Sequence, residues 1–408
     1  MVNDRKLYLA LPVLNEFENL SKLTQSLRMQ QYTDFHLVVC VNHYEDCRTQ
    51  IEMRGIVEDN EQSLLFFENL TEMEVTVIDR ASAGCGWPKG KGGVGWARKL
   101  CMDQISEMAQ PNDIVVSIDA DTHYPPNYLS EIKKSLSENP KAVGLATPYY
   151  HPLAGDETDQ LILRYEIYMR HYALQMLRIN NPYAFSALGS AMAFPVWTYR
   201  KAGGMTPVKS GEDFYFMQKL VKLGRLMLWC DTVAYPSSRF SDRVVFGTGP
   251  ALIKGDTGDW TSYPIYHPDF FDEVQLTFDA FSRLYLCDEP TPMDDFIFSK
   301  FNTHEVWSPL RKNFKKEELF VRACIEKVDG LRILQFLRER QSDAQLLDEL
   351  VFVTSYEHEW PQLFSPLLVK QLKERGLLGV DIIHLEALRE ALFIKENSLR
   401  REKYFNSL

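Results

Sequence analysis

Two aspartates close a buried-strand pattern in the segment Asp113-Ile-Val-Val-Ser-Ile-Asp-Ala-Asp121. Carboxylates two residues apart at a strand end, here Asp119 and Asp121, can hold a hard divalent cation, which bridges and neutralises a diphosphate. The same pattern arises when one aspartate caps a turn and the other is solvated, and a bare Asp-x-Asp is common by chance. The motif therefore indicates a candidate site for Mg²⁺ or Mn²⁺ and leaves the structural alternative open.

A second acidic pair, Glu212 and Asp213, stands at the start of a helical pattern in Ser210-Gly-Glu-Asp213. Acidic side chains at this place can cap the helix and favour its dipole. Alternatively, one of the two carboxylates takes the proton from an attacking hydroxyl group, and an ordinary carboxylate is ionised near neutral pH and able to do so. The second interpretation makes this pair a candidate general base.

Two glycine-containing segments carry cations that suit an anionic ligand. In segment 90–99 glycines lead into a helix, whose free N–H groups would lie beside Lys91 and Arg98 and could bind phosphate, although the P-loop spacing is absent. In segment 239–249 Arg239 and Arg243 stand four residues apart beside glycines and could close on a diphosphate. An ordinary solvated loop is the alternative for the second segment.

Short apolar runs that alternate with helical patterns must position these residues. Such alternation predicts a mostly parallel sheet covered by helices, with ligands bound beyond the carboxyl ends of the strands. We expect strands at 6–12, 36–42, 74–79, 113–118, 142–148 and 226–234. The residues that follow these strands are candidates for ligand contact: Asn15, Glu16, Asn42, Asp79, Arg80, Asp119 and Asp121.

The expected helices divide the chain into two regions. Helical periodicity is found at 16–30, 94–108, 126–137, 156–179 and 212–223, and it dominates after residue 268, for example at 312–326 and 381–404. The segment 236–263 is rich in Gly, Ser and Asp and is typical of a functional loop. We therefore expect a ligand-binding and catalytic α/β region at 1–265, followed by a mainly helical C-terminal region at 266–408.

In their order along the chain, the motifs resemble those of the family 2 glycosyltransferases and their relatives with the A-type, nucleotide-diphospho-sugar transferase fold. The matching elements are Leu11-Pro-Val-Leu-Asn-Glu16, the helix start Gly-Val-Gly-Trp-Ala-Arg-Lys, Asp119-Ala-Asp121 and Gly211-Glu-Asp213, and they cover roughly residues 5 to 250. The resemblance implies transfer of a sugar from a nucleotide-diphosphate sugar to an acceptor hydroxyl, with a divalent metal. It favours inversion, because the family is inverting, but retaining enzymes share the same fold and motifs, so retention stays open.

Carried over residue by residue, the family pattern gives each motif a role. It implies that Pro12, Asn15 and Glu16 line the nucleotide pocket. Asp119 would face the ribose or the donor sugar, and Asp121 would bind the metal. The pattern makes Asp213 the general base, with Glu212 as the second candidate, and it puts Arg98 at a donor-site position, although Lys99 replaces the usual Asn.

Two departures from the family pattern limit what it implies. Many relatives have an Asp pair after the second strand, where one carboxylate recognises the nucleobase, whereas this chain has Val41-Asn-His-Tyr-Glu-Asp46. The base of the donor therefore stays open. The QxxRW motif and the membrane helices of processive members are also missing, which argues against a synthase that extrudes a polysaccharide.

Composition narrows the class of protein further. A net charge of -11 argues against general nucleic-acid binding, because phosphate backbones require clustered Lys and Arg. Seven cysteines without a CxxC pair favour a reducing cytoplasm, and no signal peptide or apolar span of about 18 residues is found in the sequence. The identity of the acceptor stays open: it could be a saccharide, a small molecule or a lipid-linked group met at the inner membrane surface. Two rival functions also stay open, namely a sugar-1-phosphate nucleotidyltransferase and a non-catalytic protein that retains the fold.

Overall fold

The computed structural model describes residues 5–240 and 247–405 and contains one seven-stranded sheet with the order β3-β2-β1-β4-β6-β5-β7. Strands β1 to β4 pair in parallel, as do β5 and β7, whereas β6 runs antiparallel to β4 and β5. The strands are β1 (Leu7–Val13), β2 (Phe35–Asn42), β3 (Glu74–Arg80), β4 (Ile114–Ser117), β5 (Gly144–Ala146), β6 (Met192–Pro195) and β7 (Leu226–Met227). The predicted α/β class with a mostly parallel sheet is confirmed.

The two central strands are buried on both faces because helices cover the sheet. Every residue of β1 and of β2 is buried, which explains their nearly unbroken apolar sequences. Pro12 has no N–H to donate, and it lies beyond the last pair between β1 and β4, which joins Ala10 and Ser117. At that point a proline removes no hydrogen bond between β1 and β4.

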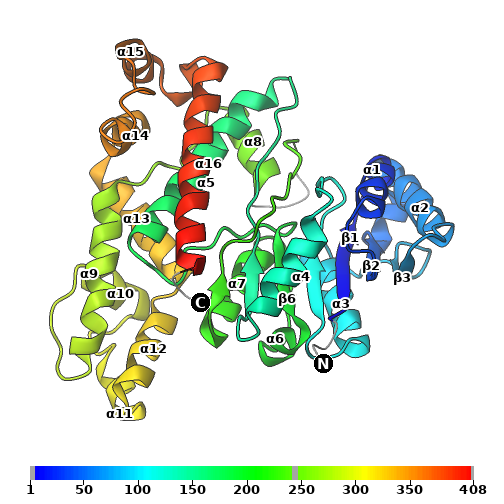
Figure 1. The fold of residues 1–408 in the computed structure, drawn as a ribbon, viewed down its shortest axis with the longest axis horizontal. Coiled ribbons are helices and arrows are strands. Elements are labelled where there is room, and N and C mark those ends of the chain that lie inside the picture. Colours follow the sequence, from blue (N-terminus) through cyan, green and yellow to red (C-terminus); the bar gives the residue numbers. More distant parts are fainter. Residues whose placement is uncertain (1–4, 241–246, 406–408) are drawn as a thin grey trace. The chain divides into compact units, whose positions relative to one another are not determined.

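Helices accompany the strands in the first half of the chain and replace them in the second (Figure 1). The first set comprises α1 (Phe17–Arg28), α2 (Arg54–Glu68), α3 (Val94–Met108), α4 (Tyr128–Glu138), α5 (Thr158–Arg178), α6 (Val196–Lys201), α7 (Glu212–Leu223) and α8 (Thr248–Asp256). The second comprises α9 (Pro268–Leu284), α10 (Asp294–Phe301), α11 (Ser308–Asn313), α12 (Glu317–Lys327), α13 (Gly330–Ala344), α14 (Asp348–Tyr356), α15 (Pro366–Arg375) and α16 (Ile382–Phe405). The predicted C-terminal helical extension is confirmed.

The structure corrects several expected elements. The strand expected at 226–234 is reduced to the two residues of β7, and the loop expected at 236–263 contains α8. The helix expected at 312–326 is two helices, α11 and α12, because Phe314 and Lys316 between them adopt extended conformations. Helix α2 was not predicted.

The chain divides into two compact units, neither of which is continuous in sequence. Unit 1 comprises residues 1–162, 185–258 and 397–408 and contains the sheet, whereas unit 2 comprises 163–184 and 259–396. The division expected at residue 265 is continuous in sequence. It differs from these units in where it puts residues 163–178 of α5 and 397–405 of α16. No helix in the described part of the chain has the length and hydropathy required to span a membrane.

Candidate functional site

The sheet order of unit 1 reverses between β1 and β4, and the carboxyl ends of these two strands are therefore the candidate ligand position. Strand order runs β1, β2, β3 to one side of this point and continues from β4 on the other, and ligands of open α/β sheets bind where the order reverses. Glu16 follows β1, and Asp119 and Asp121 follow β4. The predicted acidic residues of two separate segments therefore lie at the same edge of the sheet.

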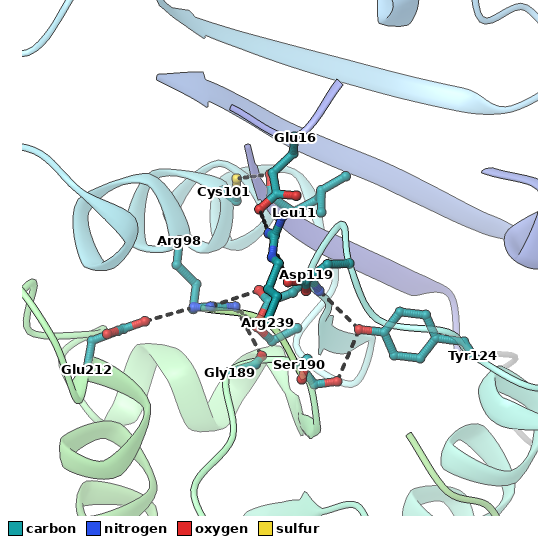
Figure 2. A network of polar contacts seen from close by, with 12 residues as sticks. Leu11, Glu16, Arg98, Cys101, Asp119, Tyr124, Gly189, Ser190, Glu212 and Arg239 are labelled. Atoms are coloured by element: carbon teal, nitrogen blue, oxygen red, sulfur yellow. Dashed lines mark hydrogen bonds and ion pairs between the residues drawn. The ribbon is translucent and has the colours of Figure 1, made fainter. Parts of the chain in front are cut away.

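Arg239 pairs with Glu16 after β1 (Figure 2) and with Asp121 after β4. Its Nη2 donates to Glu16 Oε1 and lies 2.9 Å from Asp121 Oδ2. Burial alone would lower the pKa of Arg239, but the attraction of Asp121 and Glu16 outweighs it and raises the pKa. The side chain of Asp121 is 23% exposed, so this ion pair opens to solvent.

Arg98 of α3 forms a second, deeper network, in which it extends between Asp119 and Glu212 (Figure 2). Its Nη2 donates to Asp119 Oδ1 at 2.9 Å, and its Nε donates to Glu212 Oε1 at 3.1 Å. Its Nη1 donates to Ser117 Oγ at 2.6 Å and to the carbonyl oxygen of Gly189 at 3.0 Å. The residue is 2% exposed, and the two carboxylates raise its pKa against the opposing effect of burial.

The acidic pair at the start of α7 consists of one buried and one partly exposed carboxylate. Burial and the neighbouring Asp213 raise the pKa of Glu212 to about 7, although Arg98 opposes them. Desolvation also raises the pKa of Asp213, and the charge of Arg98 lowers it. Asp213 Oδ1 accepts a hydrogen bond from the N–H of Phe214, so its side chain lies at the first turn of the helix. Two adjacent carboxyls with raised pKa values form a unit suited to moving a proton near neutral pH.

Asn60 of α2 ties the ends of β1 and β2 together, and no sequence pattern pointed to it. Its Oδ1 accepts from the N–H of Asn15 at 3.0 Å, and its Nδ2 donates to the carbonyl oxygen of Asn42 at 3.0 Å. Asn60 is completely buried, although it lies in a helix whose other buried residues are mostly apolar. Asn15 has a φ of 53°, a left-handed conformation that Asn adopts more readily than most residues.

Asn42 and Asp79, both expected to contact the donor, form hydrogen bonds within the protein. Asn42 is 1% exposed, donates to the carbonyl oxygen of Val13 at 2.8 Å and accepts from Trp87 Nε1 at 3.0 Å. Asp79 Oδ1 accepts from the N–H groups of Ala81 and Ser82, both at 2.8 Å. Desolvation would raise the pKa of Asp79, but its bonds to Ser82 and Ala81 lower it overall. These contacts shape the loop after β3.

The remaining predicted residues are placed as follows. Pro12 is buried in β1, and Lys91 is exposed with its Nζ 5.8 Å from the centre of the Trp96 ring. Arg243 lies outside the described residues.

A metal at this site would depend on Asp121. No group of three or more His, Cys, Asp and Glu residues within 5–240 and 247–405 could hold a metal ion on its own. Mg²⁺, however, is commonly held by one or two carboxylates together with substrate phosphates and water. The partly exposed carboxylate of Asp121 fits that kind of site.

No protein-family model and no curated protein sequence matches this chain. Among solved structures, TarS residues 1–349 from S. aureus, in complex with UDP-GlcNAc, matches with 14% identity, a TM-score of 0.42, and coverage of 79% of this chain and 91% of that one. The mannosyltransferase PcManGT from Pyrobaculum calidifontis, in complex with GDP-Man and Mn²⁺, matches with 12% identity, a TM-score of 0.40 and coverage of 95% and 87%. Glucosyl-3-phosphoglycerate synthase from Mycobacterium tuberculosis, in complex with Mn²⁺, UDP-Glc and phosphoglyceric acid, matches with 17% identity, a TM-score of 0.34 and coverage of 55% and 70%. Similarities at this level do not establish the activity or the substrates of this chain.

Proposed function

We propose that this chain is an A-type glycosyltransferase, which moves a sugar from a nucleotide-diphosphate donor to an acceptor hydroxyl with a divalent metal and with inversion. The supporting observation is that acidic residues from three distant segments are drawn together by two arginines. Arg239 pairs with Glu16 and Asp121, and Arg98 pairs with Asp119 and Glu212. A site of this composition suits a reaction in which a diphosphate leaves and a hydroxyl loses a proton.

Arg239 and Asp121 supply the two means of holding the donor diphosphate. The side chain of Arg239 is 29% exposed, and its planar guanidinium can exchange a carboxylate partner for a phosphate oxygen. Asp121 would hold Mg²⁺ or Mn²⁺, which neutralises the charge that develops on the leaving diphosphate. Arg239 would then stabilise the same oxygens from the protein side.

Asp213 is the residue that we assign as the general base, and Glu212 supports it. Glu212 is 4% exposed and engaged by Arg98, whereas Asp213 is of intermediate exposure, so we expect Asp213 to be the one that meets an acceptor. Direct displacement requires the base to deprotonate the attacking hydroxyl as the bond to the donor sugar breaks. The acceptor itself, a saccharide, a small molecule or a lipid-linked group, stays open, as does a cytoplasmic location.

Metal-dependent binding of a nucleotide diphosphate tests this proposal directly. We expect UDP or GDP with Mn²⁺ to raise the melting temperature of the wild-type chain, because a ligand that binds only the folded state stabilises it. The matched variant is Arg239→Gln, which keeps Asp121 but removes the cation beside it, and we expect a smaller shift. Release of the free sugar from UDP-sugars or GDP-sugars would show turnover without a known acceptor. If no nucleotide diphosphate shifted the melting temperature with either metal, the proposal would be wrong.

A further inference from the structure

Arg98 uses nearly all of its hydrogen-bonding capacity inside the protein. A guanidinium has five N–H donors. Those of Arg98 make four bonds, to Glu212, Asp119, Ser117 and the carbonyl oxygen of Gly189. The side chain is 3% exposed, which leaves little surface for a ligand. Any effect of Arg98 on a reaction must therefore pass through the residues that it holds.

We propose that Arg98 is a positioning residue, which holds Asp119 on the donor side and Glu212 beside the base in one fixed geometry. This inference rests on the proposed function and goes beyond it, because it links the two halves of the site through one side chain. Asp119 follows β4, and Glu212 begins α7, so the chain itself leaves their relative position free. One planar group bonded to both carboxylates fixes it.

The bonding pattern depends on the shape of the guanidinium as well as on its charge. Nε and Nη2 lie on one edge of the plane, where they bond Glu212 and Asp119, while Nη1 is held by Ser117 and Gly189. A lysine ammonium carries the same charge but presents a single nitrogen, which cannot reproduce this fork. Arg98→Lys therefore removes the alignment and retains the charge, whereas Arg98→Gln removes both.

Gly189 shows how closely the protein fits around this side chain. A Cβ atom at position 189 would lie 2.4 Å from Nη2 and 2.8 Å from Cζ of Arg98, distances that require movement. Because Arg98 is buried and bonded on all sides, a methyl group there must displace the guanidinium. Gly189→Ala thus disturbs the position of Arg98 without changing any charge.

The charge of Arg98 has a separate effect on the base. The charged groups that act on Asp213 are Arg98 of α3, Asp119 after β4 and Glu212 of α7. Arg98 lowers the pKa of Asp213, whereas desolvation and Asp119 raise it. Loss of the positive charge should therefore let the acidic pair take up its proton at higher pH, so that less of the base is ionised at neutral pH.

The test compares Arg98→Lys, Arg98→Gln and Gly189→Ala with wild type by kcat, donor KM and the pH profile of sugar transfer or donor hydrolysis. For Arg98→Lys and Gly189→Ala we expect kcat to fall about tenfold to 10²-fold, since misplacement by about 1 Å can cost that much. Because both variants keep the charge at position 98, the acidic limb of their pH–activity profile should change little. For Arg98→Gln we expect a similar or larger fall, with the acidic limb moved to higher pH. Arg200→Lys is the matched control, because Arg200 is an exposed arginine that bonds Ser106 and Ala109 at the end of α3. It should retain wild-type kinetics.

Three results would overturn the inference. The first is wild-type kcat in both Arg98→Lys and Gly189→Ala, and the second is a rise in donor KM alone, which would indicate direct donor contact by Arg98. The third comes from carboxyl ¹³C NMR of Asp213 and Glu212 in wild type and Arg98→Lys, which needs no substrate, with melting temperatures as the check that both proteins are folded. Carboxyl chemical shifts in Arg98→Lys that are identical to those of wild type would contradict the inference. If the wild type bound no nucleotide diphosphate, the proposed function would fail, while the NMR comparison would still decide whether Arg98 holds the two carboxylates.

Discussion

Arg98 in unit 1 and Arg170 in unit 2 are both almost completely buried, yet the carboxylates around them differ in exposure. Arg170 donates to Glu166 and, at 2.8 Å, to Glu396, and Arg389 lies 3.5 Å from Glu166. All four of these side chains are at most 2% exposed. Asp119, by contrast, is 31% exposed although it bonds the buried Arg98. The carboxylates that Arg170 bonds are thus shielded from solvent, whereas one of those that Arg98 bonds is not. The unit 2 network reaches solvent at Glu386, which lies 3.5 Å from Arg389 and is 50% exposed.

The two networks also differ in what their charges can do. In unit 2 two arginines face two glutamates of α5 and α16 within one helical interior, and Arg170 also lies over the ring of Phe393. These four side chains are too deeply buried to meet a ligand, so we expect their contribution to be to folding. In unit 1 Arg98 bonds Asp119, whose side chain is 31% exposed, and Glu212, which precedes Asp213 in the sequence. Four predictions test whether the two networks have these different roles.

The largest effect on rate is expected at Asp213, the residue that we propose as the general base. Asp213→Asn keeps the shape of the side chain but cannot accept a proton, so turnover should fall about 10²- to 10⁴-fold. Donor affinity should barely change, because we propose that the diphosphate is held at Asp121 and Arg239. Glu212→Gln should be milder. Turnover and nucleotide-diphosphate affinity are measured for both variants, and a larger loss in Glu212→Gln would move the base to residue 212.

Substitution of Arg170 in the unit 2 network should lower the free energy of unfolding without changing the rate of reaction. Arg170→Met leaves two buried carboxylates without their main partner, and breaking such a pair costs about 3–5 kcal/mol in the free energy of unfolding. Arg178→Met is the control, since Arg178 lies on the same helix in an exposed pair with Asp272 and should cost at most about 1 kcal/mol. Urea denaturation gives both values. Equal losses in the two variants would remove the distinction between the networks.

The metal assignment predicts an effect confined to donor binding. Asp121→Ala should abolish the increase in UDP or GDP affinity that Mn²⁺ produces, while the melting temperature of the free protein stays near that of wild type, because Asp121 is partly exposed. Calorimetric titration with and without Mn²⁺ measures this. Equal metal-dependent affinities in mutant and wild type would refute the assignment.

The smallest effect concerns the pH dependence of wild-type activity. The raised pKa of Glu212, about 7, and that of Asp213 mean that this pair binds a proton as the pH falls through neutrality. A base that is protonated cannot accept the acceptor's proton, so kcat/KM should fall by up to about tenfold per pH unit below that range. A profile that stays flat down to pH 5 would argue against the pair as the base.

Local sequence patterns predicted much of the frame and the types of residue at the site. The apolar runs placed β1 to β5 to within a few residues, and the periodicity of α3 and α7 gave their observed bounds, because burial on a sheet imposes these spacings. The acidic residues at the ends of β1 and β4 followed from the rule for parallel strands.

What the sequence did not reveal depends on contacts between distant segments. The antiparallel direction of β6 depends on its pairing with β4 and β5, which are distant in sequence, and not on the residues of β6 alone. The same holds for the short β7, which pairs with β5. The direction of Arg98, away from the solvent and between two acidic motifs, depends on the absence of a side chain at Gly189. No pattern in the sequence around Asn60 indicated its role, because its partners Asn15 and Asn42 lie after β1 and at the end of β2, far from it in sequence.

The bond from Asn15 to Asn60 has a consequence for amide hydrogen exchange. Asn15 is an exposed residue in the turn after β1, and turn amides of this kind ordinarily exchange their protons with solvent rapidly. Its N–H is instead donated to a side chain that is completely buried. We therefore expect the proton of Asn15 to exchange when α2 separates from the carboxyl ends of β1 and β2, so that this single surface amide reports that opening.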